Sequence, residues 1–289
     1  MRKKSNRLLG VARLAMKLGR EHMSDYGAVT SRKDFTQRQL MACLVLRAYL
    51  KTTYRGVIEI LETSEALRTE LGMKEKLPHY STLAKFCERS AVLEILTAML
   101  RRLGAAALRQ KSEPVAIDAT GLETSTASAH FISRSQKERK KWVKLSVAVL
   151  TTSLLPLGAV LDWGPNNDKC QVWPLLQQSL SGQPIPPPTL YADAGYDAEW
   201  VHGVCREEFG IATTVIKPAR CAADGSRRGE YRSQMSQDYL KAQNYGLRWK
   251  IESYMSALKR TTGSTLLSRK PANLLKEAAF KVLAYALNR

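Results

Sequence analysis

Apolar and polar positions along the chain follow two different periods, one before residue 110 and one after residue 113. In the first part, apolar side chains recur at helical spacing, as from Leu8 to Leu18, and this predicts a series of helices. Segments 54–71 and 82–108 are predicted as two of them. Thr36 begins a Thr-x-x-Gln sequence typical of a capping box, and Ser81 is the expected N-cap of the helix that follows it.

Glu113-Pro114 marks the expected boundary, after which short apolar runs alternate with helical segments. The second and third runs are predicted to pair as a hairpin around Ser153-Leu154. In chain order the predicted strands are 115–118, 142–151, 156–163, 189–193 and 211–216, and the predicted helices are 171–180, 198–209 and a long one from near Ser236. This order predicts an α/β domain over residues 113–289, preceded by an all-α region over residues 1–112.

Charge is the feature of the composition that changes this picture. The chain carries a net charge of +19, with 44% apolar and 25% charged residues. These values are typical of a globular protein with a polyanionic partner. For the basic helices before residue 112, a solvated surface and a module for DNA binding or dimerisation remain two open interpretations.

Sequence features of several other protein classes are missing. No apolar run reaches the length of about 18 residues that a membrane span needs, and no apolar core follows the basic start at Met1 as in a signal peptide. The five cysteines are odd in number, widely spread and without a Cys-x-x-Cys pair, so neither a disulfide framework nor a zinc ribbon is expected. We therefore expect a cytoplasmic protein without a membrane partner.

One helical segment near the C-terminal end gathers charged side chains on one face. Tyr245, Arg248, Glu252 and Lys259 stand at offsets of 0, 3, 7 and 14 residues, and these positions fall within an arc of about 60° on a continuous helix. Lys241 joins them from the preceding turn. An acid flanked by cations on a docked helix suits a site that holds a polyanion and a metal ion, as a site that cuts nucleic-acid strands does.

Two aspartates end predicted apolar strands. If the strands of Asp118 and Asp193 lie side by side, their carboxylates converge, and Glu252 on a neighbouring helix adds a third. Three like charges so close repel one another, and hard divalent ions such as Mg²⁺ or Mn²⁺ relieve this repulsion. Two such ions about 3.5–4 Å apart activate a water or a 3′-hydroxyl at a phosphodiester.

Each acid also has a structural interpretation. Asp118 and Asp193 can start turns, and Glu252 can be an ordinary i,i+4 partner of Arg248. Asp168 and Asp197 are placed as helix N-caps. Taken singly these signals are weak, and it is the combination of three acids in this order that favours a catalytic site.

These residues resemble the DDE transposases of bacterial insertion sequences, in the group defined by a Tyr-Arg-Glu-Lys (YREK) signature. Tyr245, Arg248, Glu252 and Lys259 keep every interval of that signature. The first aspartate of the family follows an apolar strand, as Asp118 does. The second lies in an Asp-x-Gly-Phe/Tyr motif, which Asp193, Gly195 and Tyr196 match. The resemblance covers the chain from Val115 onward.

The resemblance implies an RNase H-like catalytic domain, with a mixed five-stranded sheet flanked by helices. It implies that Asp118, Asp193 and Glu252 are the catalytic residues and hold the metal, with two Mg²⁺ or Mn²⁺ ions expected. It also implies contacts with the DNA backbone, for which the candidates are Tyr245, Arg248, Lys259, Lys241, Lys144 and His130.

The function expected from this resemblance is a transposase that cuts double-stranded DNA at element ends and transfers the freed 3′-hydroxyl strand to target DNA. Two ends must be held at once, so a homodimer on DNA is expected, associated with the nucleoid. A catalytically inactive DNA-binding relic and a plain RNase H-like nuclease are the alternatives. The intact set of acids argues against the relic, and the YREK face argues against the plain nuclease.

Overall fold

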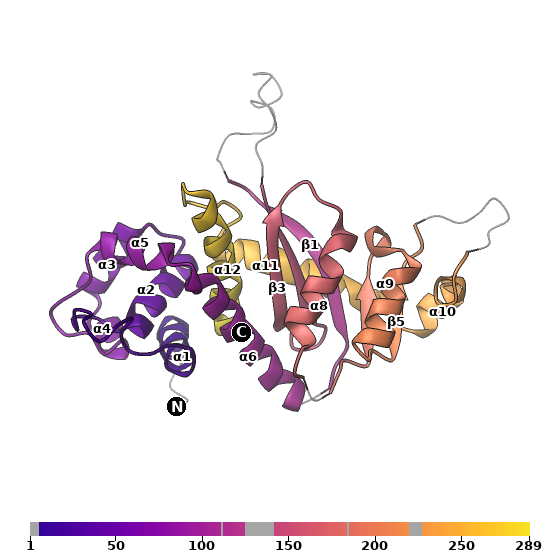
Figure 1. Ribbon diagram of the computed structural model, residues 1–289, viewed down its shortest axis with the longest axis horizontal. Helices are drawn as coiled ribbons and strands as arrows, with labels where there is room; N and C mark the ends of the chain where they lie inside the picture. Colours follow the sequence, from indigo (N-terminus) through magenta and orange to yellow (C-terminus); the bar gives the residue numbers. More distant parts are fainter. Residues whose placement is uncertain (1–5, 111, 125–141, 184, 220–226) are drawn as a thin grey trace, which may run out of the picture. The chain divides into compact units, whose positions relative to one another are not determined.

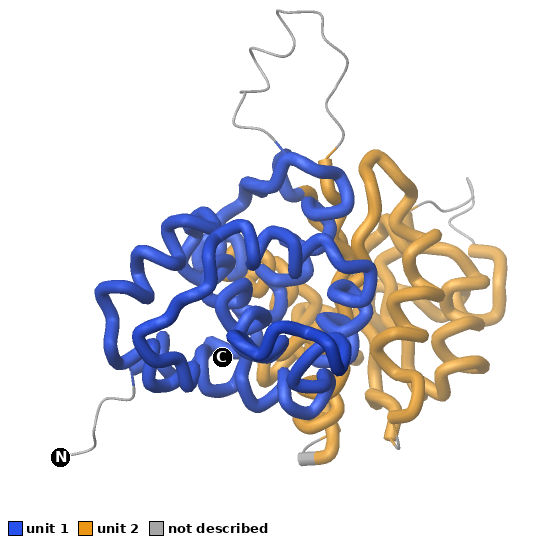
Figure 2. Tube along the Cα trace, turned by 60° about the vertical axis from the view of Figure 1, so that its left-hand side comes forward, with its two compact units in different colours: residues 1–99, 122–140, 258–289 blue, residues 100–121, 141–257 orange. Residues whose placement is uncertain are grey.

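The computed structural model describes residues 6–110, 112–124, 142–183, 185–219 and 227–289 (Figure 1). The chain divides into two compact units, coloured in Figure 2. Unit 1 comprises residues 1–99, 122–140 and 258–289, and unit 2 comprises residues 100–121 and 141–257. The units therefore do not follow the predicted boundary near residue 112, because residues 258–289 group with the N-terminal helices. That boundary stays a prediction.

Helices build unit 1, as the N-terminal pattern predicts. They are α1 (Arg7–His22), α2 (Gln37–Tyr49), α3 (Tyr54–Thr63), α4 (Glu65–Glu70), α5 (Tyr80–Glu88), the first part of α6 (Ala91–Gln110), the end of α11 (Trp249–Thr262) and α12 (Pro271–Asn288). The core of the unit forms where α2 packs against α1, α5 and α12. Sequence reasoning missed α12, although Pro271 at its first turn is a usual helix-start signal.

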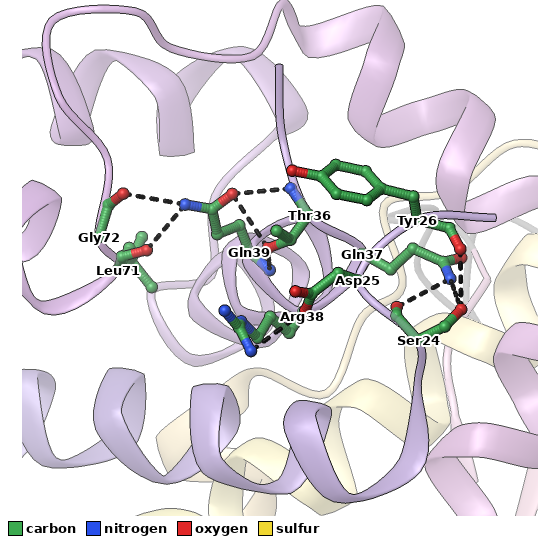
Figure 3. Close-up of polar contacts among 9 residues, drawn as sticks. All are labelled: Ser24, Asp25, Tyr26, Thr36, Gln37, Arg38, Gln39, Leu71 and Gly72. Carbon is green, nitrogen blue, oxygen red and sulfur yellow. Dashed lines mark hydrogen bonds and ion pairs between the residues drawn. The ribbon is translucent and has the colours of Figure 1, made fainter. Parts of the chain in front are cut away.

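The predicted capping box at the start of α2 is confirmed (Figure 3). The Thr36 hydroxyl accepts from the Gln39 backbone N–H, and the Gln39 side chain accepts from the Thr36 N–H at 2.8 Å. The amide of Gln39 also donates to the carbonyls of Leu71 and Gly72, at 3.1 and 3.0 Å. The Gln39 side chain thus accepts from a backbone N–H at the start of α2 and also holds the segment that follows α4.

Two helices predicted as continuous are each broken in the structure. Segment 54–71 divides at Ser64, which ends α3 in an extended conformation and caps α4 with its hydroxyl. Segment 82–108 divides between α5 and α6. The N-cap of α5 is His79 and not Ser81, because the His79 ring accepts from the Ser81 backbone N–H.

Buried charges join α12 to its neighbours within unit 1. Arg47 on α2 lies 3.2 Å from Glu277, and both side chains are buried. Lys281 donates to the carbonyls of Thr262 and Gly263, where α11 ends. Exposed carbonyls at a helix C-terminus attract cations, so Lys281 satisfies groups that the helix leaves without partners.

A mixed five-stranded sheet forms the centre of unit 2, in the order β3-β2-β1-β4-β5. The strands are β1 (Val115–Leu122), β2 (Val143–Leu150), β3 (Pro156–Trp163), β4 (Thr189–Ala192) and β5 (Thr213–Ile216). The predicted hairpin is confirmed, since β2 and β3 pair antiparallel with Val143 opposite Trp163. β4 pairs parallel with β1 on one side and with β5 on the other.

Helices flank this sheet. α8 (Val172–Leu180), preceded by the short η1 (Asp168–Gln171), packs against β2 and β3 (Figure 1). α9 (Glu199–Gly203) continues as the π-helical turn η3 (Val204–Glu208). One apolar core unites strand residues such as Ile117 with Leu175 of α8 and with the end of α6. α6 approaches closely at Gly104, where a Cβ would stand 2.8 Å from the Leu157 Cα.

The C-terminal helical face predicted from Tyr245 to Lys259 is not on one continuous helix. After α10 (Gln237–Ala242), Asn244 adopts a left-handed conformation with φ of 52°, which an α-helix cannot contain. A 3₁₀ turn, η5 (Tyr245–Arg248), follows, and α11 begins only at Trp249. The expectation that one helix aligns these side chains is therefore wrong.

Candidate active site

The sheet brings two of the predicted acids together. Asp118 lies within β1, which runs on to Leu122 and does not end at Asp118 as predicted, and Asp193 directly follows β4. In the parallel pairing of these strands, Val115 stands opposite Leu190. Continued along both strands, this register sets Asp118 level with Asp193. Adjacent parallel strands therefore carry the two carboxylates to the same place.

The surroundings of Asp118 disfavour its charged form. Burial raises the pKa of the Asp118 carboxyl to about 6, and repulsion from Asp193 and Asp168 adds to that rise. Two contacts act in the opposite direction. The Ala119 N–H donates to Oδ1 at 2.7 Å, and a guanidinium nitrogen of Arg248 lies 3.8 Å from Oδ2. Asp118 is therefore an acid for which a bound cation would relieve an existing repulsion.

Asp193 is both a turn residue and a member of the carboxylate pair. It caps the short helix η2 (Ala194–Tyr196), and its Oδ1 accepts from the Gly195 N–H at 2.8 Å. A Cβ on Gly195 would stand 2.9 Å from that same oxygen, closer than side chains tolerate. The glycine of this motif thus keeps space open beside Asp193.

Glu252 is not grouped with the two aspartates. Its side chain, in the first turn of α11, is 55% exposed and pairs with Arg248 four residues earlier, as the structural interpretation of this acid predicts. Arg248 lies near both Glu252 and Asp118 and so links the acids electrostatically. Across the described ranges, no group of three or more His, Cys, Asp or Glu side chains is arranged to hold a metal ion.

Tyr245 holds the end of the β4 strand. Its hydroxyl donates to the Ala192 carbonyl at 3.1 Å, one residue before Asp193, and burial raises its pKa to about 12. Tyr245 also lines a cleft of about 810 Å³ together with Lys217 and the exposed Lys241. Two predicted DNA contacts therefore border one cavity within unit 2.

The other predicted DNA contacts have different environments. Lys144 is buried and pairs with Asp168 at 2.5 Å, while it also donates to the Asn166 carbonyl. Lys259 lies on α11, seven residues after Glu252, and is partly buried. His130 lies outside the described residues. The charge of Lys144 is therefore offset within the protein.

Two residues near the carboxylates were not predicted as part of a site. Asp168 contributes to the raised pKa of Asp118, although the sequence suggested only a helix cap. The N-cap of η1 is in fact Asn167. Tyr196 is 1% exposed, and its hydroxyl has no hydrogen-bond partner among the residues that the structure describes. The sequence places Tyr196 in a motif, but nothing in it signals Asp168.

The donor set at this site fits a hard divalent cation. Asp118 and Asp193 offer carboxylate oxygens, which Mg²⁺ and Mn²⁺ prefer. Near them, the buried Tyr196 hydroxyl has no hydrogen-bond partner among the described residues. The raised pKa of Asp118 shows that its ionised form is disfavoured, and a bound cation would stabilise that form. The residues present are therefore compatible with metal binding.

A family model described as the transposase DDE domain matches residues 109–287. No curated protein matches the chain. Within the described part of the chain, no helix has the length and apolar character needed to cross a membrane.

Proposed function

Because the chain belongs to the transposase DDE domain family, we propose that it cuts DNA at the ends of an insertion sequence and joins the freed 3′-hydroxyl strand to target DNA. Membership of this family implies an RNase H-like fold, and the mixed five-stranded sheet flanked by helices has that architecture. The YREK signature assigns the chain, within this proposal, to the group of transposases that carry it.

The observation that carries the proposal is the register of β1 and β4. It sets Asp118 level with Asp193, and the repulsion between the two carboxylates contributes to the raised pKa of Asp118. In the proposal these two acids hold the divalent ions, and Glu252 is the third acid. When bound, the divalent ions would supply activation of the attacking water or 3′-hydroxyl and stabilisation of the leaving oxygen.

Arg248 has a central place in this proposal. Its guanidinium pairs with Glu252 and lies 3.8 Å from Asp118, so it lies beside two of the three acids that the proposal assigns to the metal. We infer that Arg248 turns to a DNA phosphate when the acids bind metal, since a guanidinium forms strong paired hydrogen bonds with phosphate oxygens. Glu252 is then released to join the two aspartates.

The remaining contacts with DNA are proposed from the same family pattern. Lys259, Lys241 and His130 would contact backbone phosphates, which position DNA without reading its sequence. Tyr245 would support the site through its bond to the end of β4. The buried ion pair of Lys144 favours a role in positioning Asp168 over a direct contact with DNA.

The proposed partner is double-stranded DNA, both element ends and target. Because two ends must be held during one reaction, we propose a homodimer on DNA, associated with the nucleoid. The net charge of +19 supports a polyanionic partner.

The direct test compares the parent with Asp193→Ala on a duplex that carries the element's terminal repeats. With Mg²⁺ or Mn²⁺ present, cleavage should fall more than about 100-fold in the variant, because an acid that holds the metal is lost. DNA binding in an electrophoretic shift should remain. A matched control is Asp34→Ala, which removes an aspartate that pairs with Lys76 in unit 1.

The same assay separates the alternatives. If the parent binds the repeats but cuts no DNA with either metal, the protein is a DNA-binding relic. If it cuts without preference for the repeats and without joining strands, it is an RNase H-like nuclease. Equal cleavage by Asp193→Ala and the parent would refute the assignment of this acid.

A further inference from the structure

A third aspartate borders the Asp118–Asp193 pair. A Cβ on Gly195 would stand 2.9 Å from Asp193 Oδ1 and 3.5 Å from Asp168 Oδ2. The oxygens of the two aspartates therefore face the same small space, which the glycine leaves open. Asp168 also acts electrostatically on Asp118. All three aspartates belong to unit 2.

Lys144 fixes the position of Asp168. The lysine side chain on β2 is 7% exposed, and its ammonium group contacts Asp168 at 2.5 Å and the Asn166 carbonyl. Asp168 itself is 38% exposed. A buried cation thus holds a more exposed carboxylate at the border of the site, and it offsets the charge that Asp168 would add to the other two acids.

Tyr196 supplies the independent sign of a ligand. Its side chain is 1% exposed, and its hydroxyl has no hydrogen-bond partner among the described residues. Burial raises its pKa, and Asp168, Asp118 and Asp193 all raise it further, which sets the ring within electrostatic reach of the three acids. Buried hydroxyls normally have a partner.

The geometry defines how these groups would act. No three acids within the described residues are placed to hold one ion directly. Mg²⁺ commonly binds one or two carboxylates and retains several waters, and the groups around such a site hydrogen-bond to those waters and orient the ligands. Two acids that hold the ion and a third group that contacts its waters match this description.

We propose that Asp168 and Tyr196 form the outer shell of the divalent-cation site, where they hydrogen-bond to waters of a hydrated cation held by Asp118 and Asp193. Lys144 is the positioning residue that keeps Asp168 in reach. This inference rests on the proposed function in one respect, namely that Asp118 and Asp193 hold the cation. It adds two residues to the site and gives the unpartnered Tyr196 hydroxyl a partner.

The test measures Mn²⁺ binding to the full-length protein without DNA, by electron paramagnetic resonance of free Mn²⁺. Asp168→Asn and Tyr196→Phe should each weaken Mn²⁺ binding, by about 10- to 100-fold for the aspartate, because loss of outer-shell partners has effects of this size. Asp34→Asn, the same substitution at an ion-paired aspartate of unit 1, should bind Mn²⁺ as the parent does.

Thermal unfolding in EDTA separates this role from a structural one. Tyr196→Phe removes only a hydroxyl without a partner, so its melting temperature should equal or exceed that of the parent. Weaker Mn²⁺ binding together with unchanged or higher stability supports the proposal. A loss of stability with unchanged Mn²⁺ affinity would assign Tyr196 and Asp168 to packing and overturn it.

Asp193→Asn distinguishes the two levels of the proposal. If Asp193→Asn loses Mn²⁺ binding while Asp168→Asn and Tyr196→Phe match the parent, the outer-shell inference fails and the proposed function stands. If Asp193→Asn binds Mn²⁺ as the parent does, the metal assignment of the proposed function fails, and the inference fails with it.

Discussion

At the scale of single residues, Asp118 shows that a residue of the candidate site can lower the stability of the folded protein. Its carboxyl has a pKa of about 6, raised by burial and by neighbouring acids. Since the folded state retains the proton to higher pH than the unfolded state does, the contribution of this group to stability is complete below about pH 4. It is lost as the pH rises through about 6. At neutral pH the ionised carboxylate therefore destabilises the metal-free protein.

Asp118→Asn should stabilise the metal-free protein at pH 7–8, by about 1–3 kcal/mol, because the amide keeps the shape without the charge. The measurement is urea unfolding in EDTA from pH 4 to pH 8. The gain should grow between pH 4 and pH 7, and a gain that does not change with pH would contradict the electrostatic explanation.

Asp34→Asn provides a control of opposite sign. Its hydrogen bond with Lys76 lowers the pKa of Asp34, so the ionised form is the stabilising one. The asparagine variant should be the less stable protein at neutral pH, and this difference should disappear toward low pH.

The acids differ in how far the sequence predicts them. Asp118 and Asp193 were identified because each follows an apolar strand segment, and the order of strands brought them together as expected. The position of Asp168 in the site depends on the turn after β3 and on its ion pair with the buried Lys144, a residue distant in sequence. No local pattern records such a contact, so this acid was interpreted as a helix cap.

At the scale of secondary structure, the apolar pattern predicts the bounds of most strands more closely than it predicts the breaks between helices. β3 has the predicted bounds, β2 is one residue shorter than predicted at each end, and β4 is one residue shorter at its C-terminal end. Breaks inside helical patterns were missed at Ser64 and Asn244, because a cap or a left-handed residue interrupts the backbone without interrupting the apolar period. The candidate face from Tyr245 to Lys259 failed for this reason.

The C-terminus of α11 offers a test of a buried lysine. Burial lowers the pKa of Lys281 to about 8, below the usual 10.5. Between these two pH values the unfolded state binds the proton and the folded state does not. The contribution of Lys281 to the free energy of unfolding therefore rises with pH. Relative to Lys281→Met, the parent should gain up to about 3 kcal/mol from pH 8 to pH 10.5.

The measurement is guanidinium unfolding of both proteins across this pH range. Lys85→Met, at an exposed position on α5, is the control and should show no such change relative to the parent. If the free energies of unfolding of Lys281→Met and the parent differ by the same amount at every pH, the lysine is charged in the folded protein throughout the range, and the prediction is wrong.

At the scale of the whole molecule, the net charge of +19 determines how DNA binding should respond to salt. A protein that neutralises 6–10 phosphates loses affinity by about 10³- to 10⁵-fold between 50 and 200 mM salt. We expect a loss in this range, measured by fluorescence anisotropy on a duplex with the terminal repeats and on a random duplex. A weak salt dependence on both duplexes would contradict phosphate-dominated binding.

The division into units was the least predictable feature. Composition and element type change near residue 113, yet residues 258–289 group with the N-terminal helices. The cause is the packing of α12 against α1, α2 and α5 together with the buried pair of Arg47 and Glu277. A change of pattern along a sequence indicates where element types change, and it carries no information about which distant segments share a core.

The position of α12 in unit 1 has a consequence for synthesis. On the ribosome, α1, α2 and α5 emerge long before α12, and every strand of the sheet is translated between them. The nascent N-terminal helices therefore expose the apolar side chains that α12 later covers. Until α12 is made, Arg47 lacks its partner Glu277. Unit 1 becomes complete only after the whole sheet and α12 have been translated, so slow or interrupted translation exposes it to aggregation and proteolysis.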